Sequence, residues 1–175
     1  MAGKAELLQM PSLPKHRICV FGSDDEPGDE VECFFRQELA YSREPLEEHR
    51  PDRNDWRFVS ICAIAHTGLV LGGVHMDVGP MNFGPLKSEK IAFVEAVRVR
   101  PEYRRAGLGT RLLTKAVEAA AALGCVHARC SVSWDNPAGI ALYRKCGFAL
   151  ADVSEDQTAA PDKAGEYFVI RPLGP

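Results

Sequence analysis

The sequence lacks any apolar run long enough to span a bilayer, and its start, MAGKAELLQMPSLPKHR, lacks the hydrophobic centre of a signal peptide. Its six cysteines form no Cys-x-x-Cys pair and have neither the spacing of a metal site nor that of a disulfide-stapled secreted domain. These absences predict a soluble cytoplasmic protein with reduced thiols, no metal and no membrane partner.

Aromatic residues are also scarce, at 8% of the chain, and the net charge is −3. The basic run RRAGLGTR, residues 104–111, contains no aromatic residue. Single-stranded nucleic-acid grooves combine positive charge with aromatic stacking platforms, so we expect no nucleic-acid partner.

The negative charge is concentrated in one segment. Residues 24–55 hold 12 of the 24 acidic residues and only four arginines, which makes this segment 8 units negative (12 − 4) and the remainder 5 units positive. Such a segment forms either an ordinary solvated helix surface or a surface that attracts cations. The sequence leaves both interpretations open.

At 175 residues the chain fits one domain, 1–175, with residues 1–16 as an N-terminal extension. A short helix is predicted between Pro45 and Pro51. The remaining hydrophobic spacing predicts longer helices over 31–41, 108–123 and 137–146, and strands over 17–21, 56–66, 69–78, 92–100, 126–133, 148–154 and 166–170.

The best-defined helix begins in an unusual way. In VRPEYRRAGLGTRLL, residues 99–113, Arg104 and Arg105 precede an apolar stripe that runs from Leu108 to Leu123 and ends before Gly124. Each arginine costs about 0.3–1 kcal/mol at the positive end of the helix dipole, unless an anion binds there.

The glycines of this segment suit such an anion. Gly107 and Gly109 allow a ligand to approach the backbone, although a plain glycine turn between strand and helix explains them as well. No Lys-Ser/Thr pair follows, which excludes a Walker loop, and Leu112 stands where the dinucleotide fingerprint needs its third glycine.

Two motifs resemble the GNAT superfamily of N-acetyltransferases. The Arg-x-x-Gly-x-Gly core within residues 99–109 resembles the family's acetyl-CoA pyrophosphate loop, and NPAGIALYRKCGF, residues 136–148, resembles its second signature. The likeness covers residues 17–172. One departure is Gly139 in place of the usual alanine, which is expected to weaken its helix by about 0.5–1 kcal/mol.

The resemblance implies an α/β fold with a mixed, mostly antiparallel sheet, flanking helices, and fourth and fifth strands that splay apart around acetyl-CoA. It implies that the backbone of Val97 and Val99 contacts the pantetheine arm and that the amides of residues 105–110 bind the pyrophosphate. Asn136, at the start of the second motif, either touches the cofactor or only caps its helix. The predicted acetyl-CoA-binding residues are Val97, Val99, Arg104, Arg105, Ala106, Gly107, Leu108, Gly109, Thr110 and Asn136.

Two residues are predicted to be catalytic. Glu95, in alternation with Val97 and Val99, is the predicted base for the amine; the alternative is a rim glutamate paired with Arg98. Tyr143 matches the family tyrosine near the CoA sulfur and is the predicted acid; the alternative is a tyrosine packed over the core.

The sequence thus predicts an N-acetyltransferase that moves the acetyl group of acetyl-CoA directly to an amine of a small molecule or peptide. The alternative is a CoA-binding sensor or regulatory module without turnover. The acidic segment favours a cationic acceptor, while polyamines, aminoglycosides, lysine side chains, protein N-termini and homodimerisation all stay open. His75 is interpreted as a strand histidine with satisfied hydrogen bonds rather than one that reaches the acceptor.

Overall fold

The computed structural model describes residues 12–22, 24–38, 57–80, 88–133, 135–150 and 166–173. The predicted helix between Pro45 and Pro51 and residues 1–11 of the predicted extension lie outside these ranges. The elements are β1 (His16–Phe21), α1 (Asp29–Glu38), β2 (Arg57–Ala65), β3 (Val70–Pro80), β4 (Lys90–Val99), η2 (Pro101–Tyr103), α2 (Leu108–Ala122), β5 (His127–Ser133), α3 (Pro137–Lys145), β6 (Ala149–Leu150) and β7 (Glu166–Pro172).

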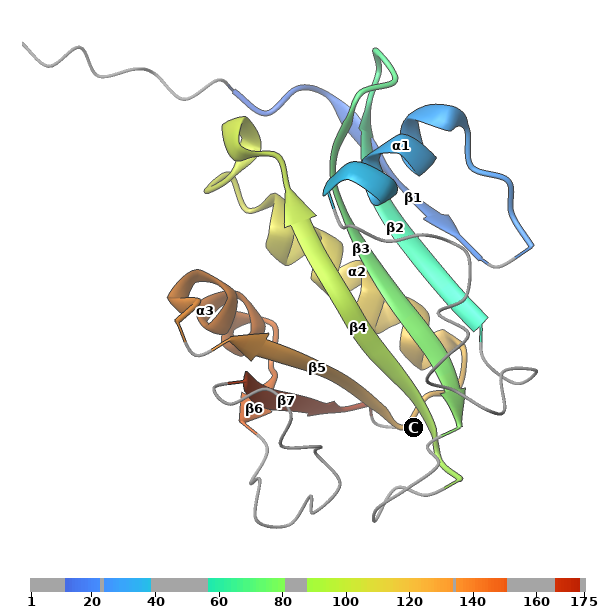
Figure 1. The fold of residues 1–175 in the computed structure, drawn as a ribbon, viewed down its shortest axis with the longest axis vertical. Coiled ribbons are helices and arrows are strands. Elements are labelled where there is room, and N and C mark those ends of the chain that lie inside the picture. The colour runs from blue at the N-terminus through green and yellow to red at the C-terminus, as the bar shows by residue number, and fades with distance from the viewer. Residues whose placement is uncertain are drawn as a thin grey trace, which may run out of the picture.

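The described strands form one sheet in the order β1-β2-β3-β4-β5-β7-β6. Neighbouring strands are antiparallel except for β4 and β5, which run parallel. Helices α1 and α2 lie on opposite sides of this sheet (Figure 1). The predicted α/β class and the mixed, mostly antiparallel sheet are confirmed.

Each side of the sheet has its own apolar cluster. On the side of α2, here called the α2 face, Val74 and Met76 of β3 pack with the helix. On the opposite side, the α1 face, a Cβ on Gly73 would lie 3.1 Å from both Phe34 and Phe35. Because strand side chains alternate between the two sides, these contacts fix the direction of each β3 residue.

Helix α2 follows its predicted pattern closely. The predicted stripe is buried from Leu108 to Ala120, and Gly124 after the helix has φ +79°, as a C-terminal cap requires. Leu123 differs from the prediction, because it is 39% exposed where the helix ends. The Leu123 backbone carbonyl accepts a hydrogen bond of 2.8 Å from Lys90 Nζ.

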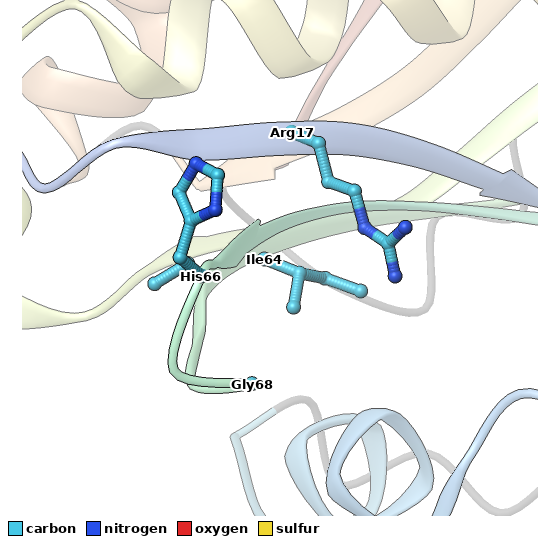
Figure 2. A pocket seen from close by; sticks show the side chains of 5 residues that line it. Arg17, Ile64, His66 and Gly68 are labelled. Atoms are coloured by element: carbon cyan, nitrogen blue, oxygen red, sulfur yellow. The ribbon is translucent and has the colours of Figure 1, made fainter.

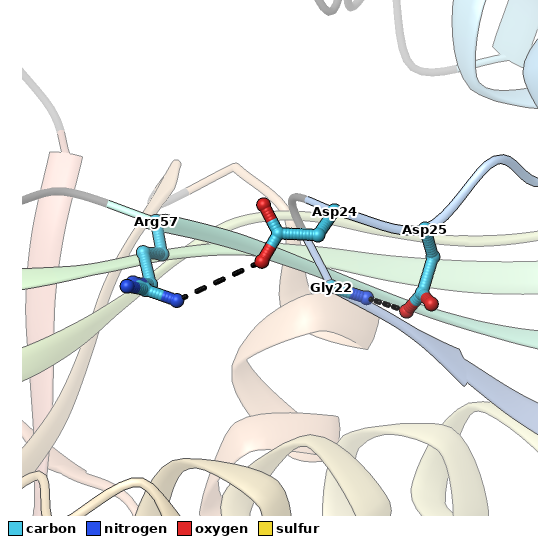
Figure 3. Close-up of polar contacts among 4 residues, drawn as sticks. All are labelled: Gly22, Asp24, Asp25 and Arg57. Carbon is cyan, nitrogen blue, oxygen red and sulfur yellow. Dashed lines mark hydrogen bonds and ion pairs between the residues drawn. The ribbon is translucent and has the colours of Figure 1, made fainter.

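The described part of the acidic segment stabilises local structure. Asp25 Oδ2 accepts a 2.6 Å hydrogen bond from the Gly22 amide, and Asp24 lies 3.9 Å from Arg57 (Figure 3). Three further acids occupy the first turn of α1, where the helix dipole favours negative charge. The remaining residues of the segment, 39–55, lie outside the described ranges.

All six cysteines are free thiols. Among the helices of the described ranges, none has the length and apolar character needed to cross a membrane. Within the same ranges, no three His, Cys, Asp or Glu side chains are grouped as metal ligands would be.

Candidate functional site

The parallel pair of strands separates after a short contact. Strand β4 pairs with β5 only over Ile91–Val94, opposite His127–Cys130. Beyond these residues β4 stays paired with β3 up to Val99, and β5 stays paired with β7 up to Ser133. We call the segments 95–99 and 131–133 the splay; Figure 1 shows the two strands diverging there. The predicted separation of the fourth and fifth strands is confirmed.

The backbone of β4 presents polar groups to the splay. The Arg100 amide donates to the Leu71 carbonyl, toward β3. Alternate residues of a strand direct their N–H and C=O groups to opposite edges, so Val97 and Val99 direct theirs toward the edge that β5 has left. The Val99 carbonyl there accepts a 2.9 Å bond from Arg104 Nε. The geometry thus suits the predicted backbone contacts.

An uncapped helix end lies next to the splay. Gly107 is the N-cap of α2, has φ +78° and ψ 0°, and no side chain caps the helix. The first amide of the helix with a helical acceptor is that of Arg111, bonded to the Gly107 carbonyl. The amides of Leu108, Gly109 and Thr110 therefore have no partner within the helix, which is the arrangement that binds phosphate.

The arginines before this helix carry a cost that folding does not explain. Arg104, Arg105 and Ala106 are exposed, and no acidic residue occupies the first turn of α2. Arg105 adopts φ +65°, a left-handed conformation that costs a non-glycine residue about 1–2 kcal/mol. A bound anion would offset both the charge and the strain, so these residues fit a pyrophosphate.

Gly109 connects the loop to the neighbouring elements. A Cβ on Gly109 would lie 3.6 Å from Leu142 of α3 and 3.7 Å from Val99 of β4. The first turn of α2 thus lies against both the end of β4 and helix α3. Thr110 extends this contact, because its carbonyl lies 3.9 Å from the Cys146 thiol that follows α3.

Glu95 lies where the splay begins, but its predicted alternation is wrong. In the pairing with β3, Met76 is opposite Val94 and His75 is opposite Ala96, so Glu95 is the extra residue of a β-bulge. Val94 and Val97 both pack on the α2 face. Glu95 is exposed, and because the extra residue interrupts the alternation, its direction does not follow from that of Val97 and Val99.

Tyr143 approaches the same point from the other side of the sheet. It is 6% exposed within the α2-face cluster, and its ring packs edge-on against Phe148 at 5.4 Å. Burial, followed by the charge and hydrogen bond of Cys130, raises the pKa of Tyr143 far above its usual value. The hydroxyl therefore keeps its proton throughout the neutral range.

Cys130 is the residue that sequence reasoning missed. It is fully buried and is paired with Val94, the last β4 residue before the splay, and its influence on the pKa of Tyr143 indicates that this hydroxyl lies near the base of the splay. Alternation with Ala128 and Val132 could have placed Cys130 on the α2 face. Only the register of β5 against β4 reveals its neighbours.

Asn136 is bound to its own helix. Its Oδ1 accepts a 2.9 Å hydrogen bond from the Gly139 amide, and this cap explains the residue without a ligand. A Cβ on Gly139 would lie 2.7 Å from Asn136 Nδ2 and 3.0 Å from Val132 Cγ2. The departure from alanine at position 139 thus makes room for the cap.

Replacing Asn136 by alanine is expected to destabilise the protein by about 0.5–2 kcal/mol, because the first turn of α3 loses its acceptor. For a chain of this size, each kcal/mol corresponds to about 2–4 °C in Tm. Thermal denaturation of Asn136→Ala beside Asn136→Ser, which keeps a capping oxygen, measures the effect. Equal Tm values for both variants and the wild type would contradict the capping role.

A separate pocket of about 350 Å³ lies toward the β1 edge of the sheet, beside the β2–β3 turn (Figure 2). It is lined by Arg17 of β1, by Ile64 and Ala65 of β2, and by His66 and Gly68 of the following turn. Strands β3 and β4 separate it in sheet order from β5. We assign the chemistry to the splay because the unpaired helix amides, Glu95 and Tyr143 all lie there.

Comparison with known proteins agrees with this geometry. The acetyltransferase (GNAT) family model matches residues 29–148, so the chain belongs to that family. An aminoglycoside N(6')-acetyltransferase type 1 of Acinetobacter genomosp. 13 is 31% identical over 62 residues, which cover 35% of this chain and 42% of that protein. The chain thus spans less than half the length of this curated relative.

Solved structures show the same fold. A nourseothricin acetyltransferase is 28% identical, with a TM-score of 0.50, and the match covers 71% of this chain and 69% of that one. Arabidopsis thaliana NAA60 in complex with acetyl-CoA has a TM-score of 0.63 at 15% identity, over 90% of this chain and 99% of that one. The second likeness concerns the fold alone.

Proposed function

We propose that the protein transfers the acetyl group of acetyl-CoA to an amine. The observation that carries the proposal is the uncapped α2 end beside the splay, where unpaired amides, a strained Arg105 and a glycine N-cap meet the free edge of β4. Family membership and the printed activities of the relatives support it. The six free thiols suit our proposal of a reducing, cytoplasmic location.

Each group of residues at the site has a proposed role in binding acetyl-CoA or in the transfer. The amides of residues 108–110, with Arg104 and Arg105, would hold the pyrophosphate, and the backbone of Val97 and Val99 the pantetheine arm. When bound, acetyl-CoA supplies an activated thioester. The exposed Glu95 is the proposed base that takes a proton from the incoming ammonium, and the buried Tyr143 hydroxyl donates a hydrogen bond to the departing thiolate.

A raised pKa makes Tyr143 a weak acid. A thiol has an ordinary pKa of about 8.5, so full proton transfer from a hydroxyl with a much higher pKa is uphill. Stabilisation of the thiolate by a hydrogen bond is the role that burial favours. This refines the predicted acid role of Tyr143.

The activity is tested by measuring free CoA thiol with acetyl-CoA and a panel of amines: a polyamine, an aminoglycoside, a lysine peptide, a peptide with a free N-terminus and an uncharged amine. We expect amine-dependent thiol release and an acetylated product of matching mass. Saturable CoA binding without turnover on any amine would favour the alternative, a sensor or regulatory module, over the enzyme.

A cationic acceptor is the proposed substrate class. Three described acids lie in the first turn of α1 and Glu95 is exposed, and two relatives are named for acceptors of their own, an aminoglycoside and nourseothricin. The same panel of amines decides whether the acceptor is a small molecule or a peptide. Light scattering decides whether the protein forms a homodimer.

Ionic strength is expected to raise the KM of a cationic acceptor more than that of acetyl-CoA, because salt screens exposed charges beyond a Debye length of about 8–10 Å. Steady-state kinetics at roughly 0.05 and 0.5 M salt measure the effect. The uncharged amine of the panel is the control. A flat response with every acceptor, or a preference for a neutral or acidic one, would contradict cation selection.

A further inference from the structure

A buried polar cluster lies behind the β-bulge. His75 of β3 is 2% exposed, and its Nδ1 lies 2.9 Å from Ser60 Oγ of β2. Its Nε2 lies 3.6 Å from Asp77 Oδ1, whose side chain is 14% exposed. Two aromatic rings pack against the imidazole, Phe35 at 5.9 Å and Phe58 at 5.8 Å. The ring is therefore hydrogen-bonded at Nδ1, packed by two aromatic rings and close to the Asp77 carboxylate.

The register places this cluster against the proposed base. His75 is opposite Ala96, and the extra bulge residue Glu95 comes directly before it. His75 and its partner Ala96 lie on the α1 face, because the adjacent Val74, Met76 and Val97 pack on the α2 face. Opposed residues of a strand pair have Cβ atoms about 4.5–5.5 Å apart. His75 is thus the buried neighbour of the bulge.

An apolar residue would suit position 75 better if packing were the only requirement, because a buried polar group gains little net stability even when it is bonded. Bulges re-aim side chains next to active sites. Other charged residues of this face nearby in the register are Arg98, opposite Gly73, and Arg129, opposite Phe93. They flank the cluster on β4 and β5.

We propose that His75, held by Ser60 and Asp77, is a positioning residue that fixes the β-bulge and thereby aims Glu95 at the acceptor amine. The inference rests on the proposed acetyl transfer and deepens it. His75 acts through Glu95 and does not touch the substrate. The satisfied hydrogen bonds of the sequence interpretation are therefore met at Nδ1, which is bonded to Ser60, whereas Nε2 lies near Asp77 beyond hydrogen-bond distance.

Kinetics of position-75 variants test the proposal. His75→Leu is expected to lower kcat at least about tenfold and to leave the KM for acetyl-CoA within about twofold, since the loss concerns the base alone. His75→Gln, whose amide can bond both Ser60 and Asp77, is expected to recover part of that loss. Ser60→Ala, a smaller change, replaces His75→Leu if the latter does not fold.

A double-mutant cycle separates positioning from a structural role. In a Glu95→Gln background, His75→Leu is expected to change kcat by less than about twofold, because the residue it positions is already inactive. Asp77→Asn, which removes the charge beside His75 Nε2, is expected to lower kcat in the wild type and to change it by less than about twofold in the Glu95→Gln background. A merely structural histidine would move neither measurement in this way.

The outcomes distinguish the positioning role of His75 from the proposed acetyl transfer on which it depends. An active wild type with equal losses from His75→Leu, or from Asp77→Asn, in both backgrounds overturns the positioning role alone. Full activity of Glu95→Gln overturns the positioning role and the assigned base but leaves acetyl transfer standing. A wild type without turnover on any amine overturns both proposals.

Discussion

Tyr143→Phe is expected to lower kcat by at least about tenfold, and Glu95→Gln to lower it within the general range of about 10²–10⁴ for acid–base groups. Both substitutions preserve size, and neither residue belongs to the pyrophosphate loop, so the KM for acetyl-CoA is expected to stay near the wild-type value. Steady-state kinetics at saturating acetyl-CoA measure the split between kcat and KM.

The pH dependence of the two variants differs. Glu95→Gln is expected to flatten or shift the acid limb of kcat, because the titrating base is gone. Tyr143→Phe is expected to leave the limbs below about pH 10 in place, because burial raises the pKa of Tyr143 and the hydroxyl stays protonated over that range. Full activity in both variants would mean that positioning and solvent alone support the reaction.

Gly107→Val is expected to abolish the thermal stabilisation that CoA gives to the wild type. At a CoA concentration of about 100 Kd that stabilisation is about 2.7 kcal/mol, on the order of 5–10 °C for a chain of this size. Among the described residues other than its chain neighbours, none has an atom within 4 Å of a Cβ placed on Gly107, so the added side chain would meet the approaching ligand and not a neighbouring element.

A second variant at position 107 distinguishes the effect of backbone strain from the obstruction of CoA by the added side chain. Gly107 has φ +78°, which valine adopts at a cost of about 1–3 kcal/mol and asparagine tolerates far better. Gly107→Asn is therefore expected to keep the Tm of the free protein and still lose the CoA-induced shift. An unchanged shift in Gly107→Asn would remove the pyrophosphate from this loop.

The parts of the fold that follow from local patterns were predictable. The stripe from Leu108 to Ala120 has one period and one clear end at Gly124, and Asn136-Pro137 combines a capping side chain with a favoured first residue, so both helices begin and end near their predicted positions. Leu123 is the exception, since a residue in the last position of a stripe is exposed when nothing covers the helix end.

Features that depend on register were not predictable. The alternation assumed for Glu95 fails because an extra residue in β4 reverses the direction of the side chains after it, and nothing in IAFVEAVRV marks which residue is extra. The contact between Ser60 and His75 joins residues 15 positions apart across a hairpin. Cys130 and Tyr143 meet only because α3 packs back onto β5.

Because β4 pairs with β5 only over Ile91–Val94, the backbone of β4 beyond Val94 forms a sheet edge between two strands of the same sheet. Edge strands with unpaired backbone groups are templates for aggregation, and proteins usually protect them at the margin of a sheet. Here the edge is β4 beyond Val94, where, among the described residues, the Arg104 side chain is bonded to the Val99 carbonyl. If a ligand pairs with that edge, its supply in the cell also protects the protein from self-association, and starvation for the ligand leaves the edge open to other chains.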